Sequence, residues 1–236
     1  MTGKSWRYAS MVALLSLSLM LGACQSVGQP AEQKSAQDAS TREALAQRHE
    51  AMLAERDEFR VGGGLGIWTD EETLSARVVW EQTPQALHLT LEGPLGVGTM
   101  QLADTQGTAT LHRGNRLLAS GRSADTVLQQ GLGLTAPVPV DELAFWVRGL
   151  PGNANRIMRD DEGKLSSLQF TDEQGTRWQA RFRRYDNWDG VAVPALITAS
   201  GGPYSVRLLL KNWSYVTKTL VSETPESNNR LSIPGR

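Results

Sequence analysis

The sequence predicts an α+β fold, in which a curved antiparallel sheet carries two short helices across its concave face. Apolar and polar residues alternate in two blocks, one before residue 113 and one after residue 164. This alternation is typical of antiparallel strands that bury one face. Two short segments of helical character, 123–130 and 141–148, lie between the blocks. Helices inserted between runs of strands favour separate layers, and a sheet covered in this way would enclose an apolar pocket.

The N-terminus has the pattern of a bacterial lipoprotein signal. Lys4 and Arg7 precede an apolar run of eleven residues, Met11–Leu21, which is too short to span a bilayer but has the length of a signal-peptide core. The run ends in Leu21-Gly22-Ala23-Cys24, which resembles the lipobox. We therefore expect cleavage after a signal at 1–23 and lipidation of Cys24. The alternative is an ordinary secretory signal with an incidental cysteine, but Cys24 is the only cysteine of the chain and an exported protein gains nothing from one free thiol.

The residues after Cys24 indicate where the protein resides. Gln25 stands where Asp commonly marks inner-membrane retention, so an outer-membrane location, lipid-anchored and facing the periplasm, is expected. The polar composition of 24–39 predicts a flexible tether. Without the signal the chain has 22 basic and 25 acidic residues, so no basic excess suggests nucleic acid binding. No second apolar run is long enough to cross a membrane.

One folded domain is expected over residues 40–220. Its first element is a helix from Ser40 to about Phe59, with Ser40 and Glu43 placed as a capping box. Strands follow around 74–80, 87–91, 97–103 and 108–112, and Thr83-Pro84-Gln85 predicts a hairpin turn.

The second half of the domain repeats the strand pattern after the two helices. Gly131 and Gly149 are the expected helix stops, and strands are predicted at 165–171, 177–185, 195–199 and 204–210. The polar segment 221–236 is expected to be a disordered tail.

The sequence offers little that could carry catalysis. His49, His88 and His112 do not have metal-ligand spacing, and no metal or other cofactor is predicted. The glycine-rich run 62–66 continues into Ile67-Trp68 as a strand, so it lacks the helix N-terminus of a phosphate loop and indicates a bulge or strand entry. The acidic run 160–163 is interpreted as a solvated turn. We expect no enzymatic activity.

Pro94-Leu95-Gly96 places one leucine in a predicted connection between two strands. Pro and Gly on either side disfavour regular structure there. The residues alone leave two possibilities: Leu95 folds into the core, or it projects and gains roughly 1.5–3 kcal/mol when a partner or bilayer buries it.

Three segments together resemble the family of the outer-membrane lipoprotein receptor LolB. They are ARVVWEQTPQALHLTLEGPLGVGTMQL, PVPVDELAFWVRGLPG and DEGKLSSLQF, the last followed by GTRWQARFRRYDNWDGVAVPALITASGGPYSVRLLLKNW. The resemblance covers about residue 45 to Trp213, and its most specific parts are the PLG loop and the block around Trp146. It implies an open antiparallel half β-barrel with short helices forming a lid over a hydrophobic cavity (LolA/LolB-like).

The resemblance also implies a function and its residues. The protein would accept lipoproteins from the periplasmic carrier LolA and insert them into the inner leaflet of the outer membrane. Its partners would be LolA, acylated lipoprotein cargo and outer-membrane phospholipid, and it would act as a monomer. Leu95, held by Pro94 and Gly96, would serve membrane insertion; Gly93 departs from the Asn that is commoner in the family. The residues expected to line the acyl-chain cavity are Leu74, Val78, Trp80, Leu87, Leu89, Leu91, Met100, Leu102, Leu128, Leu132, Leu143 and Trp146.

Two other functions fit parts of the sequence. A lipid- or hydrophobic-ligand-binding outer-membrane lipoprotein could use the same half-barrel without a transfer role. A structural lipoprotein would need no ligand at all. The PLG loop favours a receptor over the first alternative, and the apolar alternation with a helical insert disfavours the second.

Overall fold

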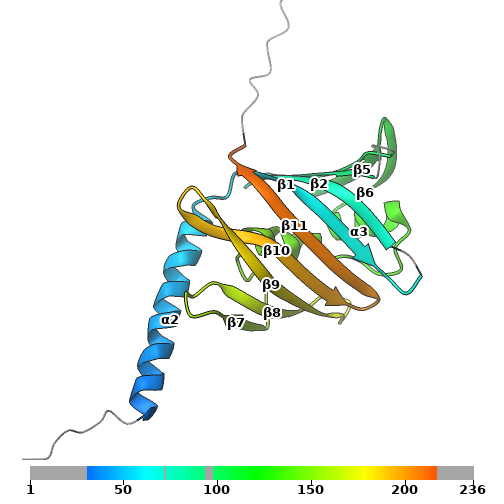
Figure 1. Cartoon of the computed structure of the whole chain (residues 1–236). Coiled ribbons are helices and arrows are strands. Elements are labelled where there is room, and N and C mark those ends of the chain that lie inside the picture. Colours follow the sequence, from blue (N-terminus) through cyan, green and yellow to red (C-terminus); the bar gives the residue numbers. More distant parts are fainter. Residues whose placement is uncertain (1–30, 72, 94–97, 217–236) are drawn as a thin grey trace, which may run out of the picture. The chain divides into compact units, whose positions relative to one another are not determined.

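A computed structural model describes residues 31–71, 73–93 and 98–216 of the chain (Figure 1). The described part contains three helices and one antiparallel sheet of eleven strands. The helices are α2 (Ala31–Ala54), α3 (Ala124–Leu132) and α4 (Val140–Arg148). The strands are β1 (Phe59–Trp68), β2 (Thr73–Thr83), β3 (Ala86–Glu92), β4 (Met100–Thr105), β5 (Thr108–Arg113), β6 (Arg116–Gly121), β7 (Arg156–Arg159), β8 (Leu165–Thr171), β9 (Arg177–Trp188), β10 (Val191–Gly201) and β11 (Tyr204–Ser214).

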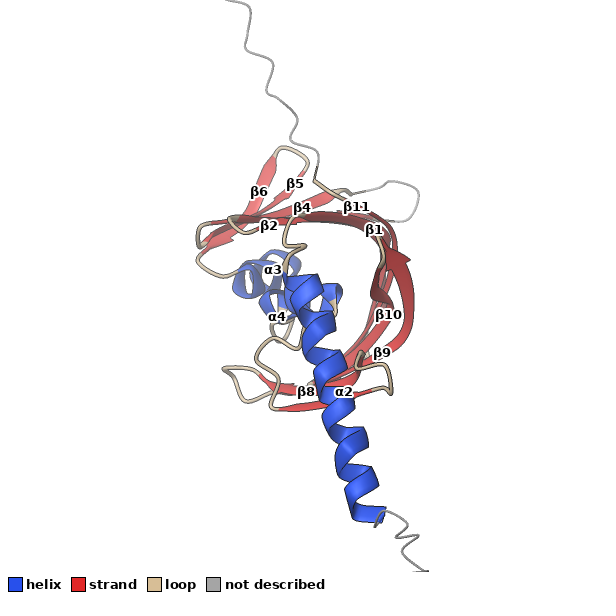
Figure 2. Cartoon of the chain, turned by 90° about the vertical axis from the view of Figure 1, so that its left-hand side faces the viewer, coloured by secondary structure: helices blue, strands red, loops and turns tan. Residues whose placement is uncertain are grey.

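The sheet is open and curls around α3 and α4. Its order is β6-β5-β4-β3-β2-β1-β11-β10-β9-β8-β7, so β1 and β11 pair in the middle and β6 and β7 form two unpaired edges. Helices α3 and α4 follow β6 in the chain and lie inside the curve of the sheet (Figure 2). The predicted α+β class, with an open antiparallel half-barrel and short helices on its concave side, is confirmed.

The glycine-rich run is a central strand, which goes beyond the expected bulge or strand entry. A bulge does lie between Arg60 and Gly62, but Gly62–Gly66 continue as β1, paired on both sides with β2 and β11. A Cβ on Gly63 would lie 1.8 Å from the backbone oxygen of Leu209. This close approach of two strands explains why only glycine fits at this position. The sequence prediction also missed the short edge strands β6 and β7.

Helix α2 differs from its prediction. It begins at Ala31, within the segment predicted to be a tether, and ends at Ala54 instead of Phe59. Ser40 lies inside the helix, where its hydroxyl donates to the carbonyl oxygen of Gln37, so the capping-box prediction was wrong. Residues such as Ala, Gln, Glu and Lys are good helix formers, which accounts for the earlier start.

The chain divides into two compact units, residues 1–44 and 45–236. Within the second unit, Ala46 and Leu53 of α2 are buried, and Nε2 of His49 donates to the carbonyl oxygen of Ala192 at 2.8 Å. His49 is therefore a buried structural residue of the helix, 7 % exposed, and not a solvated one. None of the described helices is long and apolar enough to span a bilayer.

The two lid helices have well-formed ends. The Ser123 side chain accepts a hydrogen bond from the backbone N–H of Thr126 and caps α3. Left-handed glycines end both helices, Gly149 for α4 as predicted, but Gly133 for α3 in place of the predicted Gly131.

Candidate functional site

An apolar cavity lies between the concave face of the sheet and the two lid helices. Strands β1, β2, β3 and β11 contribute one wall, and α3, α4 and the linker between the helices contribute the other. The fourteen lining residues are all apolar: Leu65, Ile67, Leu74, Val78, Trp80, Leu89, Leu91, Leu128, Leu132, Val138, Val140, Leu143, Val206 and Leu208. The indole N–H of Trp80 donates to Gln82 at 3.3 Å, so this side chain has a polar partner of its own. A site without charged or polar side chains suits a hydrocarbon ligand, which needs apolar surface and no directional contacts.

The cavity is nearly closed in this conformation. Its volume is about 30 Å³, whereas pockets that hold drug-sized ligands have ~300–1,000 Å³. The side chains of α3 and α4 therefore pack directly against the sheet, and a long hydrocarbon chain requires the lid and the sheet to separate.

The linker between the lid helices is fastened to the sheet through Tyr204. This tyrosine is 2 % exposed. Its hydroxyl donates to the carbonyl oxygen of Ala136 at 3.0 Å and accepts from the backbone N–H of Ala136 at 2.9 Å. The ring of Tyr204 stacks on Trp178 with centroids 6.5 Å apart. These contacts hold the linker between the lid helices against β11.

The structure places most, but not all, of the predicted cavity residues at this cavity. Eight of the twelve line it: Leu74, Val78, Trp80, Leu89, Leu91, Leu128, Leu132 and Leu143. Leu87, Leu102 and Trp146 are buried in the same core without lining the cavity, and Met100 is half-buried against that core. Trp146 points to the other half of the sheet, where its ring meets Phe170 edge-to-face at 6.2 Å.

Sequence reasoning missed six lining residues. Leu65 and Ile67 lie in the glycine-rich strand, and their spacing of two could have revealed them. Val206 and Leu208 alternate in a predicted strand, but only the pairing of β11 with β1 brings them to the cavity. Val138 lies between the two predicted helices, and Val140 immediately precedes the predicted start of the second helix at residue 141.

The other predicted functional residues fall outside the described residues. Cys24, Pro94, Leu95 and Gly96 are among them. Leu91 of β3 pairs with Met100 of β4, so residues 93–99 connect two neighbouring antiparallel strands, as predicted.

Two carboxylates meet at one edge of the lid. Asp125 in the first turn of α3 accepts a hydrogen bond from the backbone N–H of Asp141, at the start of α4, over 3.2 Å. Burial raises the pKa of Asp125 to about 7, and the neighbouring Asp141 carboxylate is the second cause of this shift. Such shifts also occur in catalytic sites. Here Asp125 provides the cap that α4 lacks, because the N-cap residue of α4 is Pro139. Within the described ranges no group of His, Cys, Asp and Glu side chains could hold a metal ion.

The comparisons with known proteins agree with this geometry. The family described as "Outer membrane lipoprotein LolB" matches residues 57–213. An outer-membrane lipoprotein LolB from Pseudomonas fluorescens is 30 % identical over 209 residues, which cover 86 % of this chain and 92 % of that protein. An outer-membrane lipoprotein LolB from Ectopseudomonas mendocina is 30 % identical over 169 residues, which cover 71 % of this chain and 79 % of that protein.

A solved structure supports the fold independently. A LolA superfamily protein from Nitrosomonas europaea superposes with a TM-score of 0.51 at 10 % identity, over 75 % of this chain and 94 % of that one. At this identity the likeness concerns the fold alone. The sequence matches extend over the whole sheet and both lid helices, and on this ground the chain belongs to the LolB family of outer-membrane lipoproteins.

Proposed function

We propose that this protein accepts acylated lipoproteins from the periplasmic carrier LolA and inserts them into the inner leaflet of the outer membrane. The observation that carries the proposal is the wholly apolar cavity under the two lid helices of a LolB-family chain. Acyl chains would enter between the lid and the sheet. The fourteen residues that line the cavity, eight of them predicted from the sequence, would then supply the contacts.

The energetics explain how transfer can proceed without a nucleotide. Burial of an acyl chain contributes about 0.8 kcal/mol per CH₂, so it can offset the loss of lid–sheet contacts when the cavity opens. This protein would bind cargo more tightly than the carrier does. It would then release the cargo to the bilayer, where the acyl chains are buried completely. We therefore propose a protein that breaks no covalent bond and needs no cofactor, and that works as a monomer.

The proposed domain organisation places the cavity close to the membrane. Residues 1–23 would be removed, Cys24 would carry the lipid anchor on the periplasmic side, and residues 40–220 would form the receptor domain, followed by a tail at 221–236. At least two acyl chains are needed for stable anchoring. In this proposal the anchor determines location and takes no part in the transfer itself. A Cys24→Ala variant should therefore still bind cargo but should be recovered from the soluble periplasmic fraction.

Photo-crosslinking tests where cargo binds. A photoreactive amino acid at Val78, on the cavity wall, should crosslink to acylated cargo delivered by LolA. The same group at Thr198, which lies on the opposite face of the sheet, should not. Equal crosslinking at both positions, or none at Val78, would contradict the cavity as the acceptor site.

Substitution of Leu95 separates acceptance from insertion. We expect Leu95→Glu to leave crosslinking at Val78 unchanged and to block delivery of lipoproteins into liposomes, because a carboxylate cannot enter the hydrocarbon region. Leu95→Met is the matched control and should deliver normally. Normal delivery by Leu95→Glu would exclude the loop from the mechanism. If cargo crosslinks but never reaches the liposome even in the unsubstituted protein, the alternative of a lipid-binding protein without a transfer role is supported.

A further inference from the structure

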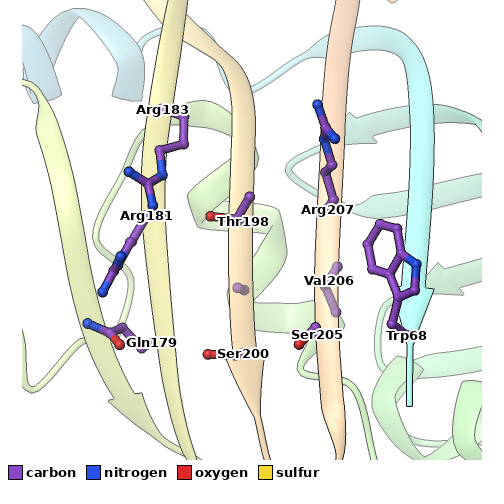
Figure 3. A pocket seen from close by; sticks show the side chains of 10 residues that line it. Trp68, Gln179, Arg181, Arg183, Thr198, Ser200, Ser205, Val206 and Arg207 are labelled. Atoms are coloured by element: carbon purple, nitrogen blue, oxygen red, sulfur yellow. The ribbon is translucent and has the colours of Figure 1, made fainter. Parts of the chain in front are cut away.

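The convex face of the sheet carries a basic groove on the side opposite the cavity. Arg181 and Arg183 of β9 form one wall, and Arg207 of β11 and Trp68 of β1 form the other (Figure 3). Gln179, Thr198, Ser200 and Ser205 complete the polar floor, and the groove has a volume of about 400 Å³.

Strand register builds the groove. Thr198 of β10 pairs with Arg181 of β9 on one side and with Arg207 of β11 on the other. These three residues therefore form one row across the three strands. Neighbouring strands are about 4.8 Å apart, which places the two arginine backbones roughly 10 Å apart with the threonine between them. Anionic groups can therefore sit between two guanidinium groups, above a hydroxyl.

The charge of this groove is not compensated within the described part of the chain. Arg181, Arg183 and Arg207 are exposed, and none of them forms an ion pair with another described residue. The surrounding strand segments, 177–183, 196–200 and 205–211, contain no Asp or Glu. By contrast, Arg60 and Arg77 on the neighbouring strands pair with Glu81 and Glu92. A concentration of unpaired arginines in a chain of net charge −1 indicates an anionic partner outside the molecule.

Trp68 gives the groove an amphipathic side. Its ring lies over Gly66, where an added Cβ would come within 2.4 Å of the indole, and the residue is 38 % exposed. Gly66 pairs with Arg207, so the indole and this guanidinium group occupy adjacent strands. Tryptophan and arginine are both favoured at the boundary between water and lipid, where each has a polar and an apolar part.

We propose that this groove binds the phosphates of anionic phospholipid head groups and holds the convex face of the sheet against the membrane surface. The lid and the cavity then face the periplasm, from which cargo arrives. A protein partner fits less well, because protein interfaces depend on large apolar anchors that fill pockets. Of the described residues that line this groove, Trp68 is the one aromatic side chain, and the other apolar residues are the small Ala199 and Val206. The proposal rests on the membrane location proposed above but not on the transfer of cargo.

Vesicle binding without cargo tests the proposal. The full mature chain carrying Cys24→Ala, which removes the anchor, is titrated with phosphatidylcholine vesicles with or without phosphatidylglycerol. Each arginine near an anionic surface is worth about a fivefold change in affinity, so Arg181→Gln with Arg207→Gln should weaken binding to the anionic vesicles about 30-fold. Binding to the zwitterionic vesicles should not change. Trp68→Ala should weaken binding to both.

A matched double variant controls for overall charge. Arg116→Gln with Arg122→Gln removes the same charge from two exposed residues of the β6 region and should change binding less than about threefold. Equal losses in the two double variants would overturn the proposal, since only net charge would matter. Unchanged vesicle binding of the Arg181 and Arg207 variant, together with weaker binding to the carrier, would identify a protein-docking surface and would also overturn it. Crosslinking at Val78 is measured in a chain that keeps Arg181 and Arg207, so this proposal and the transfer function can fail separately.

Discussion

The two faces of the central strands have opposite chemistry. In β11 the inward residues Val206 and Leu208 line an apolar cavity, while Arg207 between them lines a basic groove. In β10 the buried Ile197 has the polar Thr198 as its neighbour on the other face. A sheet of this kind supports two surfaces because its side chains alternate, and a shift of one residue in register would exchange them. One set of strands can therefore present an apolar surface on one side and a basic surface on the other.

The most severe change that we expect on the concave side is Gly63→Ala. The new Cβ would lie 1.8 Å from the Leu209 backbone oxygen, so the two central strands would have to separate. We expect a loss of stability of more than about 4 kcal/mol, or failure to fold. Urea denaturation of the purified variant measures the effect.

Gly64→Ala is the matched control on the opposite face of the same strand. A Cβ at Gly64 meets no atom within 4 Å. Because alanine loses less entropy than glycine on folding, this change should be neutral or stabilise the protein by up to about 1 kcal/mol. Similar destabilisation by both substitutions would show that the close approach of β1 and β11 is not the cause.

Substitution of one tryptophan on each face tests the difference between the buried concave side and the exposed convex side. Trp80 is 2 % exposed on the concave face, and Trp68 is 38 % exposed on the convex face. We expect Trp80→Ala to lower the free energy of unfolding by about 3–5 kcal/mol because it leaves a cavity. Trp68→Ala should cost less than about 1 kcal/mol, because its ring is half-solvated already. Equal costs in urea denaturation would contradict the assignment of the two faces.

The smallest expected effect depends on pH and concerns the lid. Burial, then the Asp141 carboxylate, raise the pKa of Asp125 to about 7 from 3.8. The native state therefore binds this proton more tightly than the unfolded state, so stability falls as the pH rises from about 4 through 7. Asp125→Asn removes that loss and keeps the oxygen that caps α4. We expect the free energy of unfolding to rise by about 1–2 kcal/mol at pH 8, a value that already allows for partial solvation of the carboxylate. At pH 4 it should change little.

Thermal unfolding of the Asp125→Asn variant at both pH values measures this gain, which corresponds to a few degrees at pH 8. Asp161→Asn, in an exposed turn, is the control and should behave alike at both pH values. A gain of the same size at pH 4 and pH 8 would mean that packing, and not charge, limits the stability of the lid.

The elements with strong local signals could be predicted from the sequence. Alternation predicted β2, β3 and β8–β11, and Gly149 ended α4 as expected, because each signal depends on residues close in the chain. The start of helix α2 was predicted at Ser40 instead of Ala31, because its polar first half lacks the apolar stripe on which the prediction relied. Strands β6 and β7 were missed because short strands at the edges of a sheet carry little alternation.

The alternation and the helical segments were enough to predict strands with one apolar face and two short helices between them, while the lipoprotein-type signal before Cys24 stays a prediction. These features are local, and the family resemblance added the expected half-barrel. Which apolar residues meet depends on the pairing of strands and the placing of the helices. Val206 and Leu208 reach the cavity because the last strand pairs with the first, and Trp146 misses it because α4 turns that side chain toward Phe170. The basic groove has the same origin, since Arg181 and Arg207 become neighbours of Thr198 only through pairing between strands that are distant in the chain.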